Sequence, residues 1–182
     1  MGAVLADLLD RYRPADADEE ADVERVRRLL ADASDPWTRA IPLHVTASAL
    51  IVHPPTRRVL LRWHARQEAW LQVGGHGDPG ETDPVAVALR EGVEETGLSD
   101  LTAWPDAAVV HVVIVPVNAK GDEPAHEHAD VRFLLATDRP GEARPEKPDA
   151  PLRWLTVPEA LAATSEPNLR ETITRAARLL EA

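Results

Sequence analysis

The sequence is 182 residues long, with 44% hydrophobic residues and a formal net charge of −11, enough to bury one sizeable core and a small appendage. The acidic charge argues against a basic surface for duplex nucleic acid, and the absence of cysteine excludes disulfides and thiolate metal sites. We therefore expect any metal to be held by oxygen or imidazole ligands, and an anionic substrate to require a cation as intermediary.

Residues 1–40 predict an N-terminal helical extension. Two helical stretches occur, at 2–12 and 18–33, and the second places apolar residues at helical spacing before the run "SDPW". Their apolar faces must be covered, so we expect them to pack on the domain or to form a homodimer contact. The sequence contains no apolar run of membrane-spanning length and does not begin like a signal peptide. We therefore expect a cytoplasmic protein with no membrane contact.

Residues 41–182 predict one layered domain. From Leu43 the sequence becomes β-branched and apolar. Strands interleaved with helices indicate an α/β or α+β fold. Two long loops, at 118–130 and 138–151, are candidates for specificity segments or for plain disorder. We expect strands at 43–52, 58–63, 70–73, 108–117, 131–136 and 152–157, and helices at 83–97, 157–163 and 168–182.

The helix expected at 83–97 gathers carboxylates. With each residue advancing roughly 100°, Val85 and Val93 lie within about 40° of Leu89 and Gly92 lies about 60° from it. We expect this stripe to be buried. Three glutamates then fall on the opposite face, where like charges repel unless a cation neutralises them. Oxygen ligands of this kind favour Mg²⁺ or Mn²⁺. The three glutamates are Glu91, Glu94 and Glu95.

A solvated acidic face is the plain alternative for such a helix. Its surroundings favour a site instead. Arg90 stands four residues before Glu94 and can hold a carboxylate in one rotamer. The preceding segment "VGGHGDPGE" leaves a strand through a glycine-rich loop, where backbone can approach a ligand or offer a carbonyl to a metal.

These residues resemble the box of the Nudix hydrolases, G-x5-E-x7-R-E-U-x-E-E-x-G-U with U aliphatic. Gly75 and Glu81 have the five-residue gap, and "REGVEETGL" at 90–98 matches the second half. Two departures occur. Eight residues separate Glu81 from Arg90, and Gly92 takes an aliphatic position. The extra residue falls in "ETDP", where an acid can cap the helix and proline can begin it. In the family this glutamate supports the arginine; the extra residue leaves that role open here.

The resemblance spans about residues 40 to 180, because the strands before the box and "LRWLTVPEAL" after it are similar to the family's flanking elements. It implies an α/β/α sandwich around a mixed sheet. It also implies a hydrolase that uses Mg²⁺ or Mn²⁺ to cleave the diphosphate linkage of a nucleoside diphosphate derivative or a related small molecule, by attack of water on phosphorus.

Within this resemblance, Glu91 and Glu95 are the first candidates for metal ligands, Glu94 is the third, and the Gly75 carbonyl is a plausible fourth. Arg90 would orient carboxylates. Metals would neutralise the diphosphate oxygens and activate water. The general base is either a glutamate of the box or an acid from a loop. Glu127, in "HEHAD", is our choice of loop acid and an additional candidate ligand, with an exposed, functionless acid as an equal alternative.

Other residues are weaker candidates. His126, His128 and Asp130 alternate and would share one side of an extended segment, as a metal or substrate constellation or, more simply, as a polar strand entrance. His76 and Trp70 are candidates for substrate binding.

Three other functions compete with a hydrolase. A Nudix-fold nucleotide-binding or regulatory module without turnover would keep the scaffold and lose the charged helix. An isoprenoid diphosphate isomerase would need a catalytic cysteine, which the chain lacks. An acidic helical interaction protein would not explain the glycine-rich loop.

Overall fold

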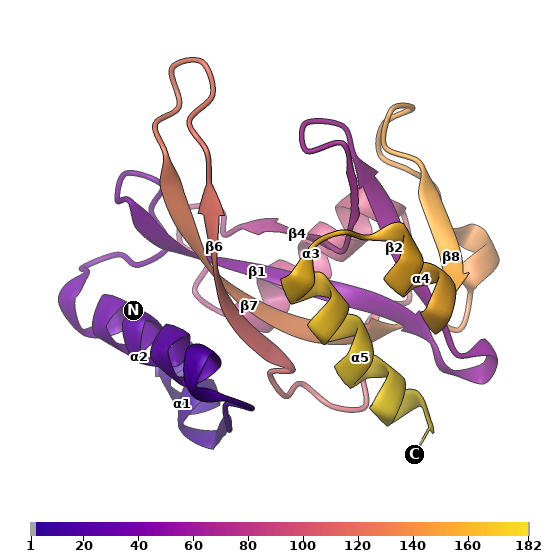
Figure 1. Cartoon of the computed structure of the whole chain (residues 1–182), viewed down its shortest axis with the longest axis horizontal. Helices are drawn as coiled ribbons and strands as arrows, with labels where there is room; N and C mark the ends of the chain where they lie inside the picture. Colours follow the sequence, from indigo (N-terminus) through magenta and orange to yellow (C-terminus); the bar gives the residue numbers. More distant parts are fainter. Residues whose placement is uncertain (1–2, 182) are drawn as a thin grey trace.

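A mixed β-sheet with helices on both faces forms the body of the protein (Figure 1). This computed structural model describes residues 3–181. Strands lie in the order β3-β2-β1-β7-β5, while β4 pairs with β1, β6 with β7 and β8 with β2. The β1–β7 pairing is parallel and the others are antiparallel. The strands are β1 Leu43–His53, β2 Arg58–His64, β3 Ala69–Leu71, β4 Val73–His76, β5 Thr102–Ala103, β6 His111–Val117, β7 His126–Ala136 and β8 Leu152–Thr156.

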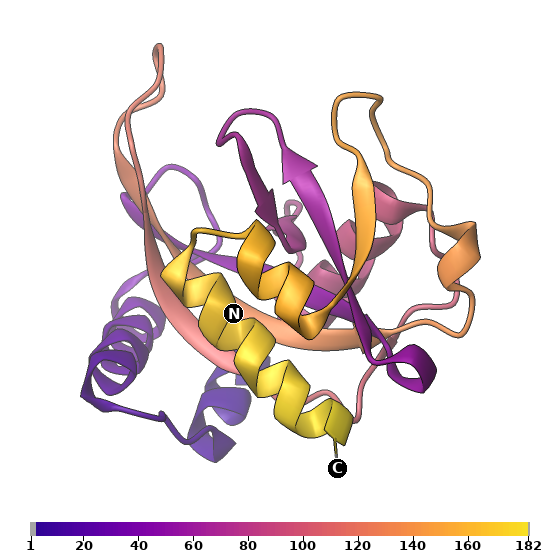
Figure 2. The ribbon, with the colours of Figure 1, turned by 45° about the vertical axis from the view of Figure 1, so that its right-hand side comes forward.

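Within residues 3–181, five α-helices cover the sheet. Two views show them on its two sides, with α4 and α5 in front and α3 behind (Figures 1 and 2). The mixed sheet between helices confirms the predicted α/β sandwich. No helix within residues 3–181 is long and apolar enough to cross a membrane. The helices are α1 Ala3–Arg11, α2 Ala17–Asp32, α3 Pro84–Thr96, α4 Val157–Ala163 and α5 Pro167–Glu181, with short 3-10 helices at Pro54–Thr56 and Pro140–Glu142.

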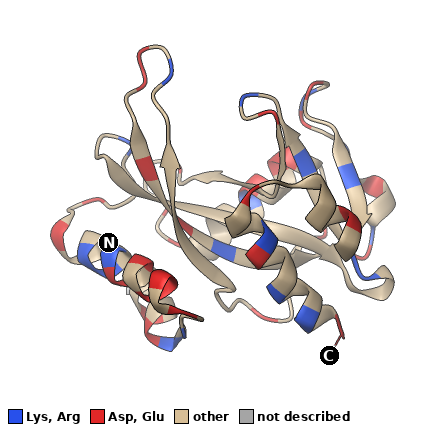
Figure 3. Cartoon of the chain, viewed as in Figure 1, with Lys and Arg blue, Asp and Glu red and all other residues tan. Residues whose placement is uncertain are grey.

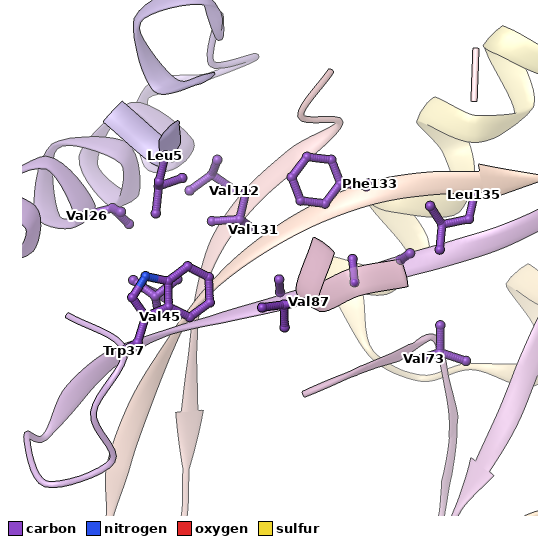
Figure 4. Close-up of a cluster of buried hydrophobic side chains, with 14 of the residues drawn as sticks. Leu5, Val26, Trp37, Val45, Val73, Val87, Val112, Val131, Phe133 and Leu135 are labelled. Atoms are coloured by element: carbon purple, nitrogen blue, oxygen red, sulfur yellow. The ribbon is translucent and has the colours of Figure 1, made fainter. Parts of the chain in front are cut away.

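Strand β1 lies at the centre, and its residues are buried on both faces from His44 to Val52. Such a strand reads as an almost continuous apolar run because helices cover both sides of the sheet. The core against α1, α2 and α3 includes Val45, Val87 and Phe133 (Figure 4). The other face packs Leu50 and its neighbours against α4 and α5. Strand β1 pairs with β4 near its start and with β2 near its end, so β2 and β4 occupy successive parts of the same edge of β1.

The N-terminal helices pack on this body. Val23 and Val26 of α2 are buried in the core, and acidic and basic residues are interleaved on α2 and on α5 (Figure 3). Glu19 of α2 is only 5% exposed. Its carboxylate accepts hydrogen bonds at 2.8 and 3.0 Å from Arg175 of α5 and another from the hydroxyl of Tyr12. This network joins the first helical pair to the last helix.

The strand predicted at 70–73 is two strands, β3 and β4, and β4 includes Gly74 and Gly75 of the predicted glycine-rich loop. Two further local predictions were wrong. The segment "HEHAD" was assigned to a loop at 118–130, but His126 to Asp130 begin strand β7, because they pair with both β6 and β1. Residues 118–125 alone connect β6 to β7. Strand β5 was missed, since its two residues carry too short a pattern to be recognised.

Candidate active site

The helix α3 begins and ends where its sequence dictates. Asp83 caps its N-terminus, because its carboxylate accepts hydrogen bonds from the backbone N–H groups of Val85 and Ala86 at 2.9 and 3.4 Å. Pro84 occupies the first turn, and Gly97 ends the helix at a φ of 68°, a conformation that suits glycine. The extra residue of the motif therefore lies in the loop before the helix, and α3 itself is unbroken.

The predicted buried stripe of α3 was right in part. Gly92 is buried, and Val85 and Leu89 pack half-buried against the core, but Val93 is 41% exposed. The buried side is therefore rotated from the Leu89 stripe and centred on Ala88 and Gly92. The cause is close packing: a Cβ on Gly92 would lie 2.9 Å from Leu101. This rotation turns Glu91 and Glu95 toward the sheet and leaves Glu94 outside.

The carboxylates of Glu91 and Glu95 lie close to the backbone of strand β4. A Cβ on Gly75 would lie 2.6 Å from Oε1 of Glu91, so a side chain there would displace the carboxylate. The N–H of Gly74 donates a hydrogen bond to Oε2 of Glu95 at 3.2 Å. Because Gly74 and Gly75 have no side chains, the carboxylates of Glu91 and Glu95 can lie directly against the backbone of β4.

Arg90 connects the parts of the motif. Its guanidinium donates to Glu81 at 2.9 Å, to Glu91 at 3.0 Å, to Glu94 at 3.2 Å and to the carbonyl of His76 at 2.8 Å. The hydrogen bond from Arg90 holds the pKa of Glu81 below its ordinary value. Glu81 thus contacts the arginine despite the longer spacing, because the extra residue is absorbed before Asp83.

Burial sets the charge state of the inner carboxylates. The side chains of Glu91 and Glu95 are 15% and 13% exposed, against 54% for Glu94. Burial raises the pKa of Glu95 to about 7, although Arg62 at 3.2 Å acts in the opposite direction. Burial also raises the pKa of Glu91. A bound cation would favour the ionised form of both groups. Buried, hard oxygen donors beside a backbone strand fit Mg²⁺ or Mn²⁺.

A cleft of about 790 Å³ opens beside Glu95, between strand β2 and the hairpin formed by β6 and β7. Glu95, Gly75 and His76 are among its lining residues. Although the whole chain is acidic, basic side chains outnumber acidic ones in the lining. The basic residues are Arg39, Arg62, Arg66, Lys120 and Arg132, and the acidic ones are Glu95, Glu123, Asp130 and Glu166.

Arg62 was missed by the sequence analysis. It lies on β2, its side chain is 11% exposed, and its buried Nε has no hydrogen-bond partner. A buried donor without a partner inside a polar cleft is suited to an anionic ligand. The available signal was the arginine within the apolar strand "RVLLRW".

Two predicted residues lie elsewhere. Glu127 pairs with Arg25 of α2 at 2.6 Å and is not among the residues lining the cleft, so the structure does not bring it to the carboxylates of α3. The physical reason is strand alternation, which points Glu127 and His128 to opposite faces of β7. Trp70 packs against Trp63 with ring centroids 5.5 Å apart, and beneath Arg153; it also lies outside the lining. His76 lines the cleft.

Comparisons with known proteins agree with this geometry. Residues 42–176 match the family described as the NUDIX domain. Similar solved structures include the E. coli dihydroneopterin triphosphate pyrophosphohydrolase, with 21% identity and a TM-score of 0.59 over 76% of this chain and 96% of that one. A C. elegans Ap4A hydrolase has 20% identity and a TM-score of 0.60 over 75% and 97%. A MutT NUDIX hydrolase from Burkholderia pseudomallei has 26% identity and a TM-score of 0.50 over 75% and 97%. No curated protein matches the sequence.

Proposed function

The chain belongs to the Nudix hydrolase family, and from that premise we propose that it is a divalent-metal-dependent pyrophosphohydrolase of nucleoside diphosphate derivatives. The observation that carries the proposal is the pair of buried carboxylates, Glu91 and Glu95, held against the glycines of β4 beside a cleft that Arg62 also lines. A module without turnover remains the alternative. The complete set of contacts around Arg90 favours the enzyme, because a binding module has no need to position three glutamates.

In the proposed site, Glu91 and Glu95 hold Mg²⁺ or Mn²⁺, with the Gly75 carbonyl as a further ligand and Glu94 as an outer one. When bound, such a cation neutralises phosphate oxygens and activates water. Arg90 is a positioning residue, since its bonds to Glu81 and Glu91 fix the carboxylate rotamers. Arg62 is in place to bind a phosphate oxygen. Glu127 is not proposed as a ligand or base, because it is paired with Arg25.

The substrate is proposed only as a class. The names of two solved relatives refer to a pterin triphosphate and to Ap4A, so nucleoside triphosphates and dinucleoside polyphosphates are the first compounds to test. We also propose that residues 1–40 are an extension of a catalytic domain at 41–182. A homodimer and a cytoplasmic location stay predictions.

The test is a screen of turnover against nucleoside triphosphates, dinucleoside polyphosphates, nucleotide sugars and dinucleotide cofactors, with Mg²⁺ or Mn²⁺ and with EDTA. We expect at least one compound to release phosphate or a monophosphate only when the cation is present, because an acidic pair cannot hold an anion alone. Nucleotide binding without turnover in either metal would favour the regulatory module. If no compound is bound and none is turned over, both functions are contradicted.

Replacing Glu81 by glutamine should lower kcat about tenfold with little change in KM, since loss of its charge loosens Arg90 without removing a ligand. Steady-state kinetics on the compound found in the screen measure this effect. Asp78→Asn is the matched control: its carboxylate lies 3.8 Å from Arg90 but is 71% exposed, so kcat should stay within about twofold. Equal effects of the two substitutions would refute the positioning role.

A further inference from the structure

Four histidines come together at the cleft: His76, His126 and His128 line it, and the ring of the buried His44 lies against theirs. His44 lies on β1, His76 ends β4, and His126 and His128 begin β7. Strand register brings them together, because His44 is paired with His128 and the neighbouring Thr46 is paired with His76. One ring nitrogen each from His44, His76 and His128 lies within 4.8 Å of the other two.

The separations suit metal ligands. The Nε2 atoms of His44 and His76 are 3.1 Å apart, and so are those of His126 and His128. Two nitrogens that bind one tetrahedral Zn²⁺ at about 2.0–2.1 Å are roughly 3.3 Å from each other. Small side-chain rotations would bring the wider separations within the triad to this value.

The outer nitrogens fix the tautomers. Nδ1 of His44 is 3.0 Å from the carbonyl of Ile41, and Nδ1 of His126 is 3.0 Å from the carbonyl of Pro124. A carbonyl only accepts, so both rings donate from Nδ1 and present the Nε2 lone pair to the cluster. A backbone carbonyl behind the second ring nitrogen is the usual support of a metal-binding histidine.

The acidic side chains beside these rings are already paired. Asp130, the nearest buried acid along β7, already accepts hydrogen bonds from Thr46 and Ser48 and pairs with Arg132. Glu123 lies 3.8 Å from Nε2 of His126 but pairs with Arg66 at 2.8 Å. These pairings leave the histidines as the ligands in this part of the cleft.

We propose that His44, His76 and His128, with His126 as the fourth ligand, bind a divalent transition-metal ion of the Zn²⁺ class. Imidazole ligands suit Zn²⁺ and its neighbours, whereas Mg²⁺ takes oxygen. The site is distinct from that of Glu91 and Glu95, because neither glutamate belongs to the cluster of ring nitrogens that lie within 4.8 Å of one another. The binding does not depend on the proposed hydrolase function. If that function holds, the same cleft would carry a second cation facing the substrate.

The experiment is isothermal titration of EDTA-treated full-length protein with Zn²⁺, in the presence of excess Mg²⁺. We expect one Zn²⁺ per chain. His76→Gln and His128→Gln should each weaken its affinity at least about 100-fold, since each removes a direct ligand. His53→Gln is the control, since His53 ends the same strand as His44 and bonds Thr56 outside the cluster. Glu95→Gln separates the two sites and should leave Zn²⁺ binding unchanged.

A second measurement covers the case in which a histidine variant fails to fold. The visible spectrum of Co²⁺ bound to the unaltered protein reports its geometry: intense bands indicate a tetrahedral, nitrogen-rich site, and weak bands indicate an octahedral, oxygen-rich one. Tetrahedral bands that Zn²⁺ displaces and Mg²⁺ does not would support the proposal. Zn²⁺ affinity that survives both histidine substitutions, falls with Glu95→Gln, or accompanies only weak Co²⁺ bands would overturn it.

Discussion

Replacing Glu95 by glutamine is expected to lower kcat/KM by at least about 10³-fold while the protein stays folded. Glutamine keeps the shape and one carbonyl oxygen but removes the negative charge that a hard cation requires. The neutral side chain should be tolerated, because burial already raises the pKa of Glu95 to about 7 and makes its ionised form costly. Steady-state kinetics and the melting temperature with and without Mg²⁺ measure both effects.

The same variant should lose most of its Mg²⁺-dependent stabilisation, since a ligand stabilises the native state only as far as it binds. Glu20→Gln is the control, being the same exchange at an exposed helical position of α2, and it should leave both activity and metal response unchanged. Near-full activity of Glu95→Gln with an undiminished response to Mg²⁺ would show that the metal lies elsewhere.

Glu19→Ala is expected to lower the free energy of unfolding by about 3 kcal/mol, because Arg175 would be left buried without its main partner. Urea denaturation measures the change. The neighbouring Glu20→Ala, on the exposed side of α2, should cost no more than about 0.5 kcal/mol. Adding Arg175→Met to Glu19→Ala should recover part of the loss by removing a buried charge whose remaining acidic partner is the half-exposed Glu171. If Glu19→Ala and Glu20→Ala have equally small effects, the stability of the protein does not depend on the ion pair between Glu19 and Arg175.

The Glu19 contribution should also depend on pH. Burial alone would raise its pKa, but hydrogen bonds from Arg175 and Tyr12 outweigh burial and lower it from 4.5 to about 2. A lowered carboxyl pKa gives stability that is fully present above about 4.5 and is lost as the pH falls toward about 2. The difference in stability between the native chain and Glu19→Ala should therefore shrink across that interval. A difference that is constant down to pH 2 would exclude an ionic contribution.

Local chemistry in the sequence predicted the bounds of α3, because Asp83, Pro84 and Gly97 act on the backbone next to them. The face that α3 buries could be predicted only in part. Val85, Leu89 and Val93 form the more apolar row, yet the helix packs most closely through Ala88 and Gly92, and Val93 is exposed. Close approach to the sheet outweighs the burial of larger aliphatic side chains, and it directs Glu91 and Glu95 inward.

The other parts of the site depend on the pairing of strands that are far apart in the sequence, and this pairing could not be predicted. The alternation of His126, His128 and Asp130 was visible, but the polarity of "HEHAD" concealed the start of β7. His44 carried no local signal, and His76 was singled out only as a candidate for substrate binding, because only the pairing of β1 with β7 and with β4 brings them to His128. The contact between Glu19 and Arg175 likewise joins residues 156 positions apart.

The most direct test of the central claim is turnover in H₂¹⁸O, with the substrate found in the screen and with Mg²⁺ supplied or removed. Water attack on phosphorus at the Glu91 and Glu95 site predicts one ¹⁸O in a phosphoryl product. The label should appear only with the divalent cation and should be absent with Glu95→Gln. Equal turnover in EDTA, or a product whose phosphoryl groups carry no ¹⁸O, would contradict metal-dependent hydrolysis at this site.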